Sequence, residues 1–304
     1  MAPISLESKD IPGIRTEMKK RLQIYGKRVA VEGDREDRIS GLAGNVIDHI
    51  LELLPVQDAA RTSILSRNWR YIWSTLPNLV LDYDFYHKLI EESESKFKLA
   101  VDEILLLHMG NIVKFILDTR GAHLSSCADI DRWVLFVTRN GVKKLTLRFS
   151  NLDTYSLPPS IFKCSTLTHL ELTNCVFKPP SSFLGFPNLI SLVLQRTTFV
   201  PTTSFCVIKV PLLEDLSLNM CHDVVPNGLP FTLNFLRHLS IFVAFDHLGQ
   251  TSYALQLIKN SPNLSKLEIW LKIMSIQAKD KSQLLITHLG QLEQEDNTAH
   301  VNTL

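Results

Sequence analysis

The amino-acid sequence predicts an α/β protein in which an N-terminal unit of three helices precedes a solenoid with a parallel concave sheet. Three observations lead to this prediction. Leucine supplies 48 of the 304 residues, six short segments repeat one leucine spacing, and a densely helical stretch comes before them. Together these features divide the chain into a helical module and an array of repeats.

The composition excludes several classes of protein. Hydrophobic residues make up 45% of the chain, charged residues 21%, and the formal net charge is +1. Proteins specialised for nucleic acid are usually strongly basic, and disordered proteins combine low hydrophobicity with high net charge. We therefore expect a globular protein for which nucleic acid is not the partner.

The sequence favours an intracellular protein. No run approaches the roughly 20 apolar residues that span a bilayer, and the N-terminal stretch lacks the apolar core of a secretory signal. The five cysteines form no Cys-x-x-Cys pair, which favours a reducing compartment over a disulfide or zinc framework. We expect no membrane contact and a location in the nucleus, the cytoplasm or both.

Residues 1–36 are predicted to be a flexible basic leader. Its segment from Arg15 to Arg28 carries six basic residues and one acidic residue. A solvated extension is the favoured interpretation, and a role in nuclear import or at an anionic surface is the alternative.

Residues 37–78 are predicted to form a helical docking module. Asn45 is a reasonable N-cap for a first helix, which Pro55 ends, and Asp58 begins a second short helix. A third helix is expected from Ser66 to Trp73. So short a unit cannot bury all its large apolar groups internally. Either it packs on the rest of the chain, or part of its apolar face belongs to a partner.

Residues 79–129 are predicted to be a linker and the N-terminal cap of the solenoid. Residues 79–82 and 114–117 are expected to be strands, and 94–108 an amphipathic helix. A further helix at residues 129–137, capped by Asp129 or Asp131, leads into the repeats.

Residues 130–272 are predicted to be leucine-rich repeats. The template LxxLxLxxN/CxL fits six times, with intervals of 25, 22, 24, 23 and 28 residues between the middle leucines. Each repeat offers a strand that cannot bury its leucines alone, so stacking the strands creates a continuous interior. The middle leucines are Leu145, Leu170, Leu192, Leu216, Leu239 and Leu267.

The template also predicts which side chains are free for binding. Cys175 and Cys221 occupy the N/C position, where we expect a structural role inside the turn. Strand side chains alternate, so template positions 3, 5 and 7 point to the concave face. Phe242 and Trp270 are either anchors for a partner or packed beneath a neighbouring segment. The candidate substrate-binding residues are Arg148, His169, Glu171, Gln195, Asp215, Asn219, His238, Phe242 and Trp270.

The sequence offers little support for catalysis. It contains no phosphate-binding glycine loop, no dinucleotide-binding glycine run, no GxSxG and no HExxH. The histidines are scattered, and paired carboxylates such as Glu91-Glu92 resemble a solvated face. We expect a protein that is not an enzyme and needs no cofactor or metal.

A resemblance to a known family rests on three parts of the helical module. The segments DRISGL ending at Leu42, ILELLP ending at Pro55, and AARTSILSRNWRYIW ending at Trp73 closely resemble the F-box of plant F-box/leucine-rich-repeat proteins. DIDRWV from Asp129 and SPNL ending at Leu264 are similar to the subgroup that usually ends in an FBD domain. The resemblance covers about residues 37–272.

The resemblance implies an adaptor role. In this family the F-box docks on the adaptor subunit of an SCF-type cullin–RING ubiquitin ligase, and through it on a cullin, while the repeats present a protein substrate. Transferred by position, the adaptor-binding residues are Leu42, Val46, Ile50, Leu51, Leu54, Pro55, Leu65 and Trp69.

The sequence departs from the family pattern at both ends of the resemblance. Ala43-Gly44-Asn45 follows Leu42, where the family usually has Pro and then an acidic residue. Residues 273–304 are polar where an FBD domain would begin, and Gln277–Leu292 is predicted to be a helix that caps the solenoid, with a frayed tail as the alternative. The alternative function is therefore a leucine-rich-repeat binding protein whose degenerate F-box docks nothing. A small-molecule receptor is a third possibility, and it requires a closed apolar pocket.

Overall fold

The computed structural model describes residues 42–65, 69–121, 124, 126–150, 155–200, 209–219, 233–244 and 248–272. The predicted leader, Cys221 and the predicted capping helix at 277–292 lie outside these residues.

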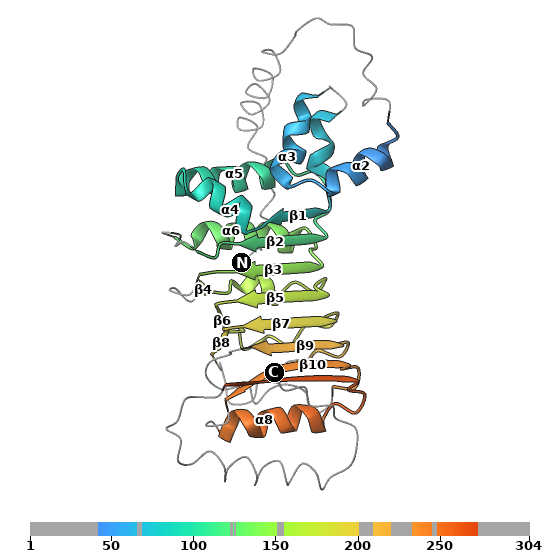
Figure 1. The fold of residues 1–304 in the computed structure, drawn as a ribbon, viewed down its shortest axis with the longest axis vertical. Coiled ribbons are helices and arrows are strands. Elements are labelled where there is room, and N and C mark those ends of the chain that lie inside the picture. The colour runs from blue at the N-terminus through green and yellow to red at the C-terminus, as the bar shows by residue number, and fades with distance from the viewer. Residues whose placement is uncertain are drawn as a thin grey trace, which may run out of the picture.

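Eight parallel strands of the described chain form one sheet, which is the central element of the fold (Figure 1). The strands follow one another in chain order, and a separate small sheet contains β4 (Tyr155–Ser156), β6 (Cys175–Phe177) and β8 (Thr198–Phe199). This arrangement confirms the predicted α/β class and the parallel solenoid sheet. The eight strands are β1 (Asn78–Leu81), β2 (Lys114–Asp118), β3 (Lys144–Arg148), β5 (His169–Thr173), β7 (Ser191–Gln195), β9 (Asp215–Asn219), β10 (His238–Ala244) and β11 (Lys266–Lys272).

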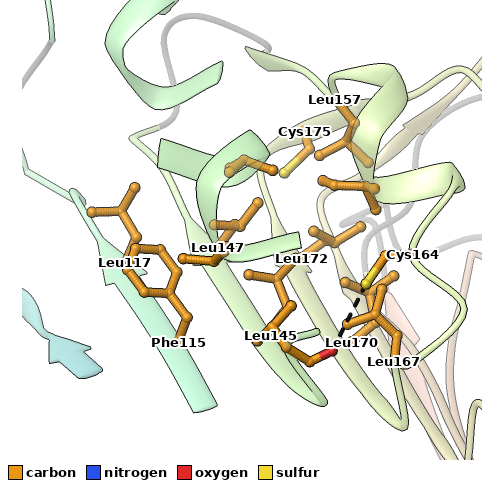
Figure 2. Packing of buried hydrophobic residues seen from close by; sticks show 14 of the residues in the cluster. Phe115, Leu117, Leu145, Leu147, Leu157, Cys164, Leu167, Leu170, Leu172 and Cys175 are labelled. Atoms are coloured by element: carbon orange, nitrogen blue, oxygen red, sulfur yellow. Dashed lines mark hydrogen bonds between the residues drawn. The ribbon is translucent and has the colours of Figure 1, made fainter. Parts of the chain in front are cut away.

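The repeated leucines pair directly across the sheet. Leu145 lies opposite Leu170 and Leu147 opposite Leu172, and the same register continues through β7 and β9 to β10. These four leucines are at most 1% exposed (Figure 2). Burying one leucine side chain stabilises a fold by about 1.5–3 kcal/mol, so the repeated motif supplies the core.

The last described strand is less well covered. Leu267 and Ile269 of β11 continue the leucine register from β10, but they are only partly buried, whereas Leu239 and Ile241 are 1% and 4% exposed. The interior is therefore more open at this end of the described solenoid.

Two strands precede the first predicted repeat. β1 pairs with β2 and β2 with β3, so the segment expected to be a linker and cap contributes two strands to the sheet. Leu79 and Leu81 of β1 are fully buried, as are Phe115 and Leu117 of β2. The template spacing begins with LPNLVL, which ends at Leu81, and continues with isoleucine and phenylalanine in IVKFIL.

Three helices accompany these strands. They are α4 (Tyr83–Ile90), α5 (Glu94–Leu107) and α6 (Ala128–Arg139). The predictions at 94–108 and 129–137 are confirmed, whereas α4 was not predicted. Asp82 caps α4 by accepting a hydrogen bond from the Phe85 backbone N–H at 2.9 Å.

The predicted cap of α6 is wrong. Cys127 is the N-cap, and its side chain makes no capping hydrogen bond to the helix. The Asp129 carboxylate is 3.0 Å from the Lys98 ammonium, and the Asp131 carboxylate accepts a hydrogen bond from the Tyr155 hydroxyl. Both carboxylates therefore join the helix to other elements instead of capping it.

The turn after β5 holds the predicted structural cysteine. Asn174 adopts a positive φ of 56°, and its side-chain amide donates to the Phe149 carbonyl at 2.7 Å. Cys175 follows with 0% exposure at the start of β6 (Cys175–Phe177), which pairs with β4 (Tyr155–Ser156) and β8 (Thr198–Phe199). Burial raises the pKa of the Cys175 thiol, so this side chain is a neutral part of the core.

Two further helices lie in the described part of the repeat region: α7 (Pro159–Phe162) precedes β5, and α8 (Leu248–Lys259) follows β10. Phe162 of α7 packs edge-on against Phe177, with ring centroids 5.1 Å apart. The α7 helix thus covers the same core that the leucines fill.

Truncating one repeated leucine tests the contribution of this core. We expect Leu172→Ala to lower the free energy of unfolding by about 3 kcal/mol, because a fully buried leucine leaves a cavity. Urea denaturation measures the change. Leu184 is 72% exposed, and Leu184→Ala should change stability by less than about 0.5 kcal/mol. Equal losses in the two variants would contradict the proposed leucine core.

Candidate functional site

The described part of the N-terminal module contains four short helical segments. They are α2 (Gly44–Glu52), α3 (Val56–Arg61), and the 3-10 helices η1 (Thr62–Ile64) and η2 (Trp69–Thr75). In its described part the third predicted helix is therefore a 3-10 helix that continues to Thr75, and residues 66–68 lie outside the described chain.

The predicted helix starts need correction. The N-cap of α2 is Ala43 and not Asn45, and it makes no side-chain capping bond. α3 begins at Val56, two residues before Asp58, because Pro55 is its N-cap and the Pro55 carbonyl accepts hydrogen bonds from the Asp58 and Ala59 N–H groups at 2.9 Å. Asp58 instead pairs with Arg61 at 2.8 Å.

One face of the module is built into the solenoid. Trp73 and Leu76 are 6% and 5% exposed, and they belong to the same core as Leu79 of β1. The Met109 N–H donates to the Ser74 carbonyl at 2.8 Å, which joins the end of α5 to η2. Figure 1 shows the module beside β1 at one end of the sheet.

The other face of the module exposes apolar side chains. Within residues 42–65, seven large apolar side chains are at least 36% exposed, and Leu53 and Ile64 reach 73% and 74%. Such a density of exposed apolar groups is typical of a surface that binds another protein. We call this set the box surface: Leu42, Val46, Ile50, Leu53, Leu54, Ile64 and Leu65.

The predicted adaptor-binding residues divide into two groups. Leu51 and Trp69 are only 0% and 3% exposed, so they support the module from within and cannot form its contact surface. The reason is helical geometry, because Leu51 shares the inward face of α2 with Ile47. Leu53 and Ile64 were not predicted, although both adjoin predicted positions. The predicted residues that are exposed are Leu42, Val46, Ile50, Leu54, Pro55 and Leu65.

The predicted substrate-binding residues share one face of the sheet. All nine lie on β3 to β11 at alternating positions, and each is at least partly exposed. The register aligns them in three rows across the strands. The first row holds His169, Asp215 and His238; the second holds Glu171; the third holds Arg148, Gln195, Asn219, Phe242 and Trp270.

An ion-pair network occupies the N-terminal part of this concave face. The Arg148 guanidinium bonds the Glu171 carboxylate at 2.7 Å and lies 3.4 Å from the Asp118 carboxylate. The Asp118 side chain is only 2% exposed, and its carboxylate also pairs with the Arg120 guanidinium at 2.7 Å. A buried carboxylate needs such partners, so Arg148 has a structural role as well as an exposed position.

A shallow hollow of ≈ 110 Å³ lies farther along the concave face. The His238 imidazole is 2.5 Å from the Asp215 carboxylate, and the Lys266 ammonium is 2.7 Å from Glu268. The residues that line the hollow are Val193, Asp215, Leu216, Ser217, His238, Leu239, Ser240, Lys266 and Glu268. The hollow is open and lined by charged and hydroxyl side chains as well as apolar ones, so it differs from the closed apolar pocket that a small-molecule receptor would require.

Two aromatic side chains lie farther along the strands β10 and β11 that line the hollow. Phe242 lies opposite Trp270 in the register, and the Trp270 indole N–H donates to the Ser240 hydroxyl at 3.3 Å. Trp270 remains 48% exposed, whereas Phe242 is half-buried. Trp270 therefore keeps surface available for a partner.

The described residues show neither a membrane helix nor a metal cluster. None of the described helices combines the length and apolarity that crossing a bilayer requires. In the described ranges, no three His, Cys, Asp or Glu side chains are placed to hold a metal ion together.

Helical module and leucine-lined sheet together define a repeat protein with a second, N-terminal interaction unit. A family model described as the At1g61320/AtMIF1 LRR domain matches residues 104–303, and the F-box domain model matches residues 39–81. The chain belongs to the F-box/leucine-rich-repeat proteins of plants.

Curated relatives from Arabidopsis thaliana support this membership. The chain is 40% identical over 201 residues to F-box/FBD/LRR-repeat protein At1g13570, covering 64% of this chain and 46% of the relative. It is 30% identical over 239 residues to FBD-associated F-box protein At5g56370, covering 77% and 54% respectively. The chain thus spans about half the length of these relatives, and no solved structure matches it.

Two glycines provide a matched test of local structure. Gly44 lies in α2 with open space around it, so Gly44→Ala should raise the free energy of unfolding by about 0.5–1 kcal/mol. Gly185 has φ +134°, and an added Cβ would lie 2.0 Å from the Lys209 carbonyl oxygen. We expect Gly185→Ala to lower stability by about 1–3 kcal/mol. Chemical denaturation measures both, and a stabilising Gly185→Ala would contradict the structure.

A histidine on the concave face should make the stability of the folded protein depend on pH. Burial and the Lys144 ammonium lower the pKa of His169 in the folded protein. The unfolded chain, with a histidine pKa of about 6.5, then binds protons more readily, so His169 should reduce stability as the pH falls below about 6.5. Lys144→Met should raise the His169 pKa and lessen this loss. NMR titration of the His169 ring checks the shift, and an unchanged or lower pKa would refute it.

Proposed function

We propose that this protein is the substrate-recognition subunit of an SCF-type cullin–RING ubiquitin ligase. The box surface binds the SCF adaptor subunit, and through it a cullin, while the concave face binds a protein target. The protein itself has a non-catalytic role, in the nucleus, the cytoplasm or both. The observation that carries this proposal is the division of the module into one face packed on the solenoid and one exposed apolar face.

The contact between module and solenoid gives this proposal a physical basis. Trp69 and Trp73 bury their rings in the core, and the η2 segment hydrogen-bonds the loop after α5. A ligase subunit has to hold its target at a defined place relative to the adaptor. A module sharing one core with the solenoid meets that requirement better than a tethered one.

Charge substitutions on the box surface test adaptor binding. Leu53 and Leu65 are 73% and 54% exposed, so Leu53→Asp with Leu65→Asp should leave folding intact. We expect the Kd for the purified SCF adaptor subunit to rise at least about tenfold, because carboxylates would be buried in an apolar interface. Isothermal titration calorimetry measures the Kd.

The control for this test lies on the solenoid. Leu184 is 72% exposed, and Leu184→Asp should leave the Kd unchanged. Thermal unfolding of each variant checks that folding is preserved. If the double variant bound the adaptor as tightly as the native chain, the box surface would not be the docking surface.

The competing proposal is a leucine-rich-repeat binding protein whose degenerate box binds no adaptor. It rests on Ala43-Gly44-Asn45, where the family pattern has proline and an acidic residue. Ala43 has φ −62° and ψ 142°, a conformation that proline also adopts. We expect the native chain to bind the adaptor, and we expect Ala43→Pro with Asn45→Asp to strengthen this binding modestly. Binding only after these substitutions would favour the degenerate box.

A further inference from the structure

Acidic groups on the concave face already have partners within the protein. Asp118 and Glu171 share Arg148, Asp215 pairs with His238, and Glu268 pairs with Lys266. These are all the Asp and Glu side chains that the described strands β2 to β11 place in the three rows.

Two lysines in the first row, unlike these carboxylates, have no ion-pair partner among the described residues. Lys114 of β2 lies opposite Lys144 of β3, which lies opposite His169 of β5. Neighbouring strands are about 4.8 Å apart, and like charges directly opposite each other are destabilising. Within the described part of the chain, no carboxylate lies within ion-pair distance of either lysine. We call Lys114, Lys144 and His169 the lysine ladder.

The carboxylate that the neighbouring strand β5 places on this face is already paired. Glu171 lies on β5 two residues beyond His169, and its carboxylate accepts hydrogen bonds from Arg148 at 2.8 Å and from Thr146 at 3.5 Å. The His169 ring is also engaged, since its Nδ1 lies 2.9 Å from the Thr168 hydroxyl. The ladder therefore keeps a local positive charge that no carboxylate in the described residues neutralises.

Spacing on the ladder indicates the form of an acidic partner. Residues at i and i+4 on a helix have Cβ atoms about 5–6 Å apart, whereas alternate residues of an extended strand are about 6.6 Å apart. The helical spacing is closer to the roughly 4.8 Å between Lys114 and Lys144. A helix with one acidic stripe would satisfy both ammonium groups.

Neighbours of the ladder argue against nucleic acid. Binding of single strands normally combines cations with aromatic side chains on which bases stack. The residues beside the ladder in the second row are Ile116, Thr146 and Glu171. The aromatic Phe242 and Trp270 lie on β10 and β11 at the other end of the sheet. Figure 1 places β2 and β3 at the end near the helical module.

We propose that the lysine ladder binds an acidic helical segment of the target protein, pairing Lys114 and Lys144 with two carboxylates one helical turn apart. This inference deepens the proposed function and rests on the concave face receiving a protein target. The ladder thereby directs the acidic segment to the end of the solenoid beside the helical module.

A designed probe tests the ladder without knowledge of the target. The probe is a fluorescein-labelled, alanine-based helical peptide with glutamate pairs at i and i+4, and its control carries glutamine at the same positions. Fluorescence anisotropy with the full chain measures the Kd. We expect the glutamate peptide to bind at least about tenfold more tightly than the glutamine peptide, and more weakly as salt is raised.

Two matched double variants distinguish the effect of the ladder lysines on peptide binding from the effect of net charge. Lys114→Gln with Lys144→Gln should weaken glutamate-peptide binding at least about tenfold. Lys163→Gln with Lys178→Gln removes the same charge from exposed positions outside the sheet, and binding should stay within about twofold. Thermal unfolding of the ladder variant should occur at the same or a higher temperature, since like charges have been removed.

Three results would overturn the inference. These are equal losses in the two double variants, equal binding of the two peptides, and a ladder-dependent preference for a phosphopeptide or a single-stranded oligonucleotide over the glutamate peptide. The ladder variant should still bind the SCF adaptor subunit normally. If the native chain bound the glutamate peptide but no adaptor, the ligase proposal would be refuted. The inference that the lysine ladder binds an acidic helix would still hold.

Discussion

Direct pairing of leucines across parallel strands is the constraint on which the rest of the structure depends. Leu145, Leu170, Leu192, Leu216 and Leu239 occupy one register, and a shift of one residue would turn each of them toward water. The same register aligns the outward side chains in rows. Core packing therefore determines which polar groups become neighbours on the concave face, including groups that repel one another.

The helical module depends on the same core. Its tryptophans complete the interior next to β1, so the module is an end piece of the solenoid as well as a docking unit. Packing also decides which apolar residues remain outside. Leu51 and Leu54 are close in sequence, yet the first is fully buried and the second is 36% exposed.

The repeated leucine spacing predicted much of the fold because each repeat carries the pattern of its own strand. It did not reveal β1 and β2 as members of the sheet, since isoleucine and phenylalanine replace leucine in IVKFIL and long helices separate the two strands. Helix caps were also missed. Asp129 and Asp131 are good caps by type, but tertiary partners engage both carboxylates.

For the binding surfaces, alternation along strands was a better guide than family position on helices. All nine predicted concave residues lie on the expected face, whereas Leu51 and Trp69 are buried. The ion pairs of Arg148 could not be predicted from the sequence, because they link it to Glu171 and Asp118, which are 23 and 30 positions away. The unneutralised Lys114–Lys144 pair emerges only when the register is known.

Partial burial of Leu267 and Ile269 has a consequence for the dynamics of the solenoid. In a one-dimensional stack each repeat is held only by its neighbours, so the cost of local opening follows the quality of each interface. The end beside the module is sealed by Trp73, Phe97 and Trp133, while the β11 interface is more open. Along the described array, amide protection against hydrogen exchange should therefore decline from β2 toward β11, and unfolding should begin as fraying at β11.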